Sequence, residues 1–181
     1  MLTVQPPDAG QTGRMRWLTA LLAATLLTLA GCGSQTARAP GDTDLIGTGK
    51  TADLNFAATT LDGERFEGTT LEGKPAVLWF WAPWCPTCRA QSVTVSELAE
   101  KYDGKVAVVG VGGQDSRAAI EELAERIPHV THLVDSEGEV WKHFRVTAQS
   151  TYEVIAADGE IIAQGYLDDD ELVSLVNQLS G

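Results

Sequence analysis

The 181-residue chain has only three cysteines and few basic residues, with 13 Lys and Arg against 25 Asp and Glu. The formal charge of −12 argues against a nucleic-acid partner, because phosphate backbones are bound through clusters of basic side chains. The main apolar run, residues 17–30, has about 14 residues, fewer than the roughly 20 that a membrane-spanning helix requires. A nucleic-acid-binding protein and a permanent transmembrane anchor are therefore both disfavoured.

The first 31 residues have the layout of a bacterial export signal. Arg14 and Arg16 precede the apolar run, and small residues follow it. Leu29-Ala-Gly-Cys32 resembles the bacterial lipobox, in which cleavage falls before the cysteine and its sulfur receives a diacylglyceryl group. We therefore expect a lipoprotein signal peptide over residues 1–31, lipidation of Cys32, and attachment to the extracytoplasmic face of the cell membrane. An ordinary cleaved signal peptide with an incidental cysteine is the alternative.

The rest of the chain divides into a short tether and one domain. Residues 32–49 are rich in Gly, Ser, Thr and Pro and lack periodicity, which predicts a flexible tether. Residues 50–181 suit one compact domain. Apolar patterns predict hairpins within 54–66 and 152–164, buried strands over 75–81, 106–111 and 131–134, and helices around 95–102, 120–127, 138–144 and 172–179. This order predicts an α/β fold with a mixed central sheet and helices on both faces.

One glycine-rich stretch partly matches a dinucleotide-binding loop. Gly110-Val-Gly-Gly113 lacks the third glycine of a dinucleotide-binding loop, because Asp115 stands in its place. We predict that it is a turn at the end of a strand.

Two cysteines stand where a buried strand gives way to a helix. Free backbone N–H groups and the helix dipole favour the thiolate form of Cys85, which predicts that Cys85 is the nucleophile. Cys88, one turn later, is expected to be buried and to resolve a mixed disulfide. An inert bridge would restrain only a very short loop, and a structural zinc site would need further ligands, so redox chemistry is favoured over both.

The sequence around these cysteines is similar to that of a known family. Trp81-Ala-Pro-Trp-Cys-Pro-Thr-Cys88 resembles the thioredoxin-family active site, and residues 50–181 resemble the secreted branch with TlpA-, ResA-, DsbE- and DsbF-type proteins. The resemblance implies a thioredoxin-like fold with an N-terminal β-hairpin extension and a redox-active Cys85–Cys88 disulfide. It also implies exported cysteine-containing proteins as partners, without cofactor or metal, and it is compatible with a membrane redox partner. The residues expected beside the substrate are Trp84, Pro86, Thr87, Gln149 and Ser150.

Two departures from the family pattern affect these expectations. Ser150 takes the place of the family's cis-proline, so we expect a trans Gln149–Ser150 bond, because a cis bond before a residue other than proline costs about 2.5–4 kcal/mol. One hypothesis is that the Ser150 hydroxyl donates to the Cys85 thiolate. Trp79 occupies the position of thioredoxin's buried aspartate, which leaves no acid there to handle the Cys88 proton.

The direction of electron flow stays open. An oxidising compartment and the missing acid favour a disulfide oxidase or isomerase. A reductant for cytochrome c maturation is the main enzymatic alternative. A copper-binding or copper-delivery module is the alternative from another class, because soft thiolates suit Cu(I).

Overall fold

The computed structural model describes residues 48–181. The predicted signal peptide, the lipidation site Cys32 and nearly all of the predicted tether lie outside these residues, so these assignments stay predictions. Within residues 48–181, no helix is long and apolar enough to cross a membrane.

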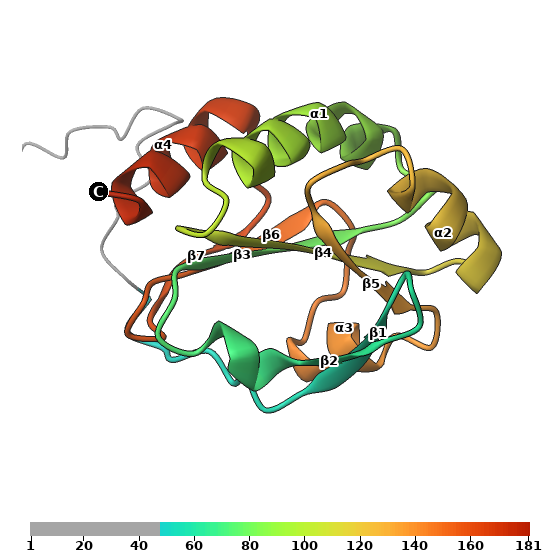
Figure 1. The fold of residues 1–181 in the computed structure, drawn as a ribbon, viewed down its shortest axis with the longest axis horizontal. Helices are drawn as coiled ribbons and strands as arrows, with labels where there is room; N and C mark the ends of the chain where they lie inside the picture. Colours follow the sequence, from blue (N-terminus) through green and yellow to red (C-terminus); the bar gives the residue numbers. More distant parts are fainter. Residues whose placement is uncertain (1–47) are drawn as a thin grey trace, which may run out of the picture. The chain divides into compact units, whose positions relative to one another are not determined.

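Seven strands form one mixed sheet in the order β2-β1-β5-β4-β3-β6-β7 (Figure 1). The strands are β1 (Ala57–Thr60), β2 (Arg65–Glu67), β3 (Ala76–Trp81), β4 (Ala107–Gly113), β5 (Thr131–Asp135), β6 (Thr151–Ile155) and β7 (Ile161–Gly165). Strands β3, β4 and β5 are parallel, while the β1–β2 hairpin and the β6–β7 hairpin are antiparallel to their neighbours. The predicted N-terminal hairpin therefore extends the sheet beyond β5.

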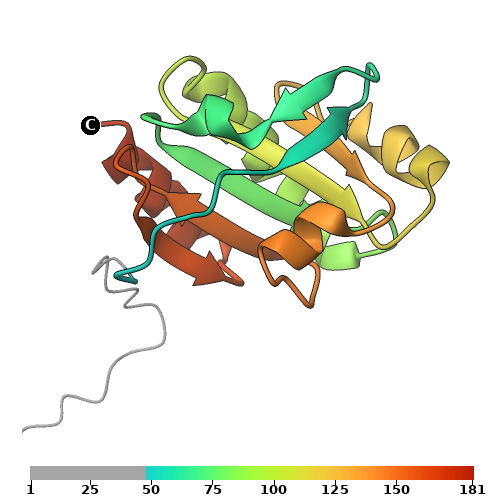
Figure 2. The same ribbon diagram turned by 90° about the horizontal axis from the view of Figure 1, so that it is seen from below.

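Helices cover both faces of this sheet. Helices α1 (Pro86–Lys101), α2 (Arg117–Ala124) and α4 (Asp169–Leu179) lie on one face, and α3 (Glu139–His143) lies on the other with the short 3-10 helix η1 (Gly68–Leu71) (Figures 1 and 2). This arrangement confirms the predicted mixed sheet with helices on both faces.

Strand β3 divides its side chains between two cores. Val77, Trp79 and Trp81 pack in the core under α1, α2 and α4, while Leu78 and Phe80 pack in the core under α3. All six residues of β3 are buried, as expected for a strand covered on both faces. The unbroken apolar run that predicted this strand is thus explained by its central position.

The glycines of β4 correct one prediction from the sequence. Gly110, Gly112 and Gly113 are not in a turn but belong to the buried strand, which continues to Gly113. A Cβ at Gly112 would lie 2.5 Å from Ile120 Cγ2, and one at Gly113 would lie 2.6 Å from Trp141 Nε1. These positions lack side chains because large residues from the adjacent layers occupy the space.

Candidate active site

Cys85 and Cys88 lie at the N-terminus of α1. Cys85 is the N-cap residue, and its Sγ accepts a hydrogen bond from the Cys88 backbone N–H at 3.1 Å. Both cysteines are free thiols; Cys88 is fully buried and Cys85 is 4% exposed. This placement agrees with the predicted context of a helix N-terminus, although the catalytic roles of the two sulfurs stay predictions.

Local sequence explains why the helix begins here. The Cys85 backbone N–H donates to Ala82 O at 3.1 Å, which closes a turn directly after β3. Pro86 occupies the first helical position, where its fixed φ suits the helix and its missing N–H removes no intrahelical bond. The chain therefore leaves the sheet and enters α1 with Cys85 at the junction.

The environment of Cys88 disfavours its thiolate. Burial raises the pKa of the Cys88 thiol to about 12, and its hydrogen bond with Cys85 raises the pKa in the same direction. Backbone hydrogen bonds from Ala82 and Ser150 oppose this effect only in part. Cys88 therefore holds its proton in the dithiol state, which fits a resolving residue better than an attacking one.

Ser150 lies in a backbone conformation that the sequence did not indicate. Its φ is 66°, in the left-handed region, and no peptide bond in residues 48–181 is cis, so the expected trans Gln149–Ser150 bond is confirmed. The Ser150 backbone N–H donates to Phe80 O at 2.9 Å. This bond ties the loop to the end of β3, close to where the chain enters the cysteine turn.

The hypothesis that the Ser150 hydroxyl donates to Cys85 is wrong for this structure. Ser150 Oγ donates instead to Gln91 Oε1 at 2.9 Å. The same oxygen accepts from Trp79 Nε1 at 3.2 Å, and Gln91 Nε2 donates to Leu167 O at 3.2 Å. Gln91 thus joins four segments beneath the cysteines, because its amide provides both acceptor and donor groups.

Sequence analysis missed Gln91 and Tyr152. Gln91 lies one turn after Cys88 on the same face of α1, and this helical spacing was the available indication of its position. Tyr152 is fully buried in the core that contains both cysteines, and its hydroxyl has no hydrogen-bond partner in residues 48–181. Burial raises the pKa of Tyr152 above its ordinary value, so the hydroxyl stays protonated.

The other residues predicted to lie beside the substrate surround the pair at the surface. Trp84, which directly precedes Cys85 in the chain, is 49% exposed. Its indole Nε1 donates to Gln114 O at 3.1 Å, and this bond fixes the orientation of the ring. Pro86 and Thr87 are exposed, Gln149 is partly buried and Ser150 is buried. Trp84, Pro86 and Thr87 are therefore open to a partner, whereas the hydroxyl and the backbone N–H of Ser150 are already hydrogen-bonded within the protein.

His132 and His143 have partners away from the cysteines. His132 is buried with Nε2 at 3.1 Å from Ile127 O, and burial lowers its pKa to about 4. His143 Nε2 lies 2.6 Å from Asp53 O. Within the described part of the chain, no group of three or more His, Cys, Asp or Glu residues is arranged to hold a metal ion.

Comparison of the sequence with known proteins gives a consistent family. The Redoxin family model matches residues 47–179. The soluble secreted antigen MPT53 of Mycobacterium tuberculosis is 38% identical over 107 residues, which is 59% of this chain and 61% of that protein. The thiol-disulfide oxidoreductase ResA of Oceanobacillus iheyensis is 29% identical over 136 residues, covering 70% of this chain and 68% of ResA. The chain thus spans about three fifths of the MPT53 antigens.

Solved structures agree with the sequence relatives. MTB dsbF, solved in mixed oxidised and reduced forms, has 43% identity and a TM-score of 0.65, covering 70% of this chain and 96% of dsbF. A secreted Mycobacterium tuberculosis disulfide oxidoreductase homologous to E. coli DsbE has 35% identity and a TM-score of 0.63, covering 71% of this chain and 100% of that chain. These likenesses confirm the predicted thioredoxin-like fold and the resemblance to DsbE- and DsbF-type proteins.

Proposed function

Since the chain belongs to the Redoxin family, we propose that it is a thiol-disulfide oxidoreductase that exchanges disulfides with exported proteins through Cys85 and Cys88. The observation that carries this proposal is the cysteine pair at the start of α1, with Cys85 as N-cap and Cys88 fully buried one turn later. The relatives named as secreted antigen and as oxidoreductase support the same activity in an extracytoplasmic setting.

The proposed oxidation of a substrate proceeds in two exchanges. A substrate thiolate attacks Cys85 Sγ, the Cys85–Cys88 bond breaks, and Cys88 leaves as a thiolate that takes up a proton. A second substrate thiolate then attacks the substrate sulfur bound to Cys85, which forms the substrate disulfide and releases Cys85 as a thiolate. Two electrons pass from the substrate to the enzyme. Because the pKa of Cys88 is about 12, its released sulfur is protonated at neutral pH, and the thiol form does not attack the mixed disulfide.

The direction of exchange is proposed to be oxidation or isomerisation. An oxidising compartment supports this direction. The second support is that position 79 holds a tryptophan in place of thioredoxin's buried aspartate. Trp79 is buried and donates to Gln91. Reduction of haem-binding cysteines in cytochrome c maturation is the alternative. The two differ in the reduction potential that the cysteine pair must have.

The reduction potential of the full chain tests the activity and its direction together. The chain would be equilibrated in graded glutathione buffers and followed by tryptophan fluorescence, with Trp84 beside the pair as the reporter. A potential near about −120 mV would mark a disulfide donor, and one near about −270 mV would mark a reductant. A Cys88→Ser variant should accumulate a mixed disulfide with substrate, and a Cys85→Ser variant should not.

Failure of both readouts would overturn the proposal. If no reversible redox transition is found, the remaining candidate is the copper-binding module, in which both thiolates hold Cu(I). Stoichiometric metal that is retained on purification and lost in the Cys85→Ser/Cys88→Ser double variant would then identify that function.

We further propose that a lipid on Cys32 anchors the protein to the extracytoplasmic face of the membrane. The support is the sequence alone, through the lipobox-like residues 29–32 after the apolar run. Incorporation of labelled palmitate into the full chain, and its loss in Cys32→Ser, is the expected result. Equal labelling of both proteins, or labelling of neither, would contradict the anchor and leave a freely secreted form like the soluble antigen relatives.

A further inference from the structure

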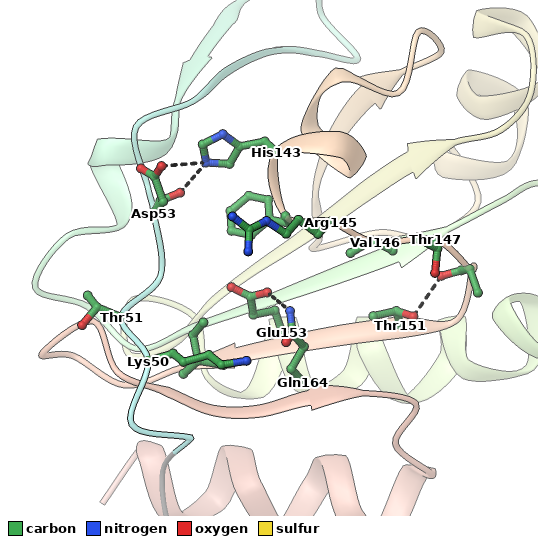
Figure 3. A pocket seen from close by; sticks show the side chains of 13 residues that line it. Lys50, Thr51, Asp53, His143, Arg145, Val146, Thr147, Thr151, Glu153 and Gln164 are labelled. Carbon is green, nitrogen blue, oxygen red and sulfur yellow. Dashed lines mark hydrogen bonds and ion pairs between the residues drawn. The ribbon is translucent and has the colours of Figure 1, made fainter.

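A pocket lies on the opposite face of the sheet from the cysteine core. It has a volume of about 430 Å³ and is lined by α3, by the loop that follows α3, by strands β6 and β7 and by residues 50–53 (Figure 3). Glu153, on its floor, pairs in register with Leu78, which belongs to the core under α3. Cys85 and Cys88 belong to the other core. The pocket is therefore separate from the proposed active site.

Glu153 is a buried acid with incomplete hydrogen bonding. Its side chain is 1% exposed, and Oε2 accepts from Gln164 Nε2 at 2.9 Å. No donor in residues 48–181 bonds to Oε1, and Figure 3 shows the carboxyl group pointing into the pocket. Burial raises the pKa of Glu153 to about 7, and the charges of His143 and Lys50 compensate only in part. Because Oε1 borders the pocket, it can accept a hydrogen bond from a ligand bound there.

Two cationic side chains face the same space. Figure 3 shows the head groups of Lys50 and Arg145 beside the Glu153 carboxyl group. The charge of Lys50 already acts on the Glu153 carboxyl group, and Arg145 is exposed to solvent. The neighbouring acid Asp53 pairs with His143 instead, with Oδ2 at 3.7 Å from Nε2. The pocket therefore offers donors from two cations and an acceptor from one acid.

We propose that this pocket binds a small zwitterion, a free amino acid or a short peptide. Arg145 and Lys50 hold its carboxylate, since a guanidinium fork and an ammonium are both suited to carboxylates. Glu153 Oε1 accepts from its ammonium group. A simple anion would leave Glu153 without a donor and add a negative charge beside it, and a simple cation would leave Arg145 and Lys50 without an acceptor. A ligand with both charges complements all three groups at once.

The test uses zwitterions in which the distance between the two charges increases with each added glycine residue. Glycine, diglycine and triglycine would be titrated into the 15N-labelled full chain and followed by amide chemical shifts. Acetate and methylamine, at the same ionic strength, carry one charge each. We expect at least one zwitterion to bind about tenfold or more tightly than either single-charge probe, with shifts at residues 50, 145, 151–153 and 164. If glycine binds most tightly, the ligand class is a free amino acid. If diglycine or triglycine binds most tightly, the ligand class is a short peptide.

Variants separate the site from general charge effects. Arg145→Gln and Glu153→Gln should each weaken binding about tenfold or more, and Arg145 is exposed, so its substitution leaves the core intact. Lys142→Gln is the matched control, because this α3 lysine is exposed and pairs with Glu139 at 2.8 Å; it should bind as the unmodified chain does. The Cys85→Ser/Cys88→Ser variant should also bind normally, which makes the result independent of the proposed redox function.

Three results would overturn the proposal. The first is that no zwitterion causes a saturable chemical-shift change. The second is that acetate binds as tightly as the zwitterions. The third is that Arg145→Gln and Glu153→Gln both bind the zwitterion as tightly as the unmodified chain.

Discussion

Ser150 holds a backbone conformation that costs free energy for any residue with a Cβ. Its φ of 66° is left-handed, a region that costs L-residues other than glycine about 1–2 kcal/mol. Two hydrogen bonds hold it there, from its N–H to Phe80 O and from its hydroxyl to Gln91 Oε1. The loop beside the cysteines therefore depends on a Ser–Gln contact where the family uses a cis-proline.

This conformation predicts an order of stability for two substitutions. Ser150→Ala and Ser150→Gly both lose the hydroxyl bond to Gln91, but only glycine relieves the left-handed strain. We expect Ser150→Gly to be the more stable variant by about 1 kcal/mol in urea unfolding. Equal stabilities, or a more stable Ser150→Ala, would show that the loop adopts a different conformation.

Glu153 and His132 are predicted to have opposite effects on stability as the pH changes. The pKa of Glu153 is raised from 4.5 to about 7, so the folded state binds more protons in this window and loses stability as the pH rises through it. The pKa of His132 is lowered from 6.5 to about 4, so its contribution is lost as the pH falls through that window. The two effects oppose each other between pH 4.5 and 6.5.

Glu153→Gln removes one of these effects. Relative to the unmodified chain, we expect the variant to gain up to about 3 kcal/mol of unfolding free energy as the pH rises from 4.5 to 7.5. Urea unfolding of both proteins across this range measures the difference. A constant difference at every pH would mean that Glu153 has the same pKa in the folded and the unfolded chain.

The amino-acid composition of strand β4 is explained by the side chains that pack against it. Glycine is a poor strand former, yet glycines occupy half of the strand's last six positions. A Cβ at Gly112 would lie 2.5 Å from Ile120 on α2 and 2.9 Å from the Trp81 ring. The large side chains of β3 and α2 can approach only because β4 has no side chain there.

Gly112→Ala should therefore destabilise the fold by overpacking. We expect a loss of about 1–3 kcal/mol in unfolding free energy, since the Ile120 and Trp81 side chains that the new methyl would meet are both fully buried. Val93→Ala on α1 is the control, because Val93 is 62% exposed and its loss should change stability by no more than about 0.5 kcal/mol. A Gly112→Ala variant as stable as the control would contradict the packing described for β4.

Burial in the domain decreases from the central strand β3 to the β1–β2 edge of the sheet. Every residue of β3 is buried, while the β1–β2 hairpin at the edge of the sheet is mostly exposed or half-buried. Protection from exchange follows burial and the number of surrounding layers. Amide hydrogen exchange should therefore be at least about a hundredfold slower in β3 than in β1 and β2. Uniform protection over all three strands would show that the hairpin unfolds only with the rest of the domain.

The order of elements followed from local patterns in the sequence. The unbroken apolar run of residues 75–81 predicted a buried strand, and the helical spacing after it predicted α1, because both periodicities arise from backbone geometry within one segment. The placement of Cys85 and Cys88 at a helix start was predictable for the same reason. Strand ends were less certain, as the glycines of β4 show, because their cause lies in other segments.

The contacts between distant segments were decided only by the tertiary structure. Ser150 and Gln91 are 59 residues apart, and neither sequence neighbourhood indicates the other. Lys50, Arg145 and Glu153 meet at one pocket because β6 lies beside β3 and the chain enters the domain past β7. The sequence by itself determined the strand–helix order and the cysteine pair, which depend on local periodicity and capping. Sheet order and layer packing alone determined which polar side chains share a buried space.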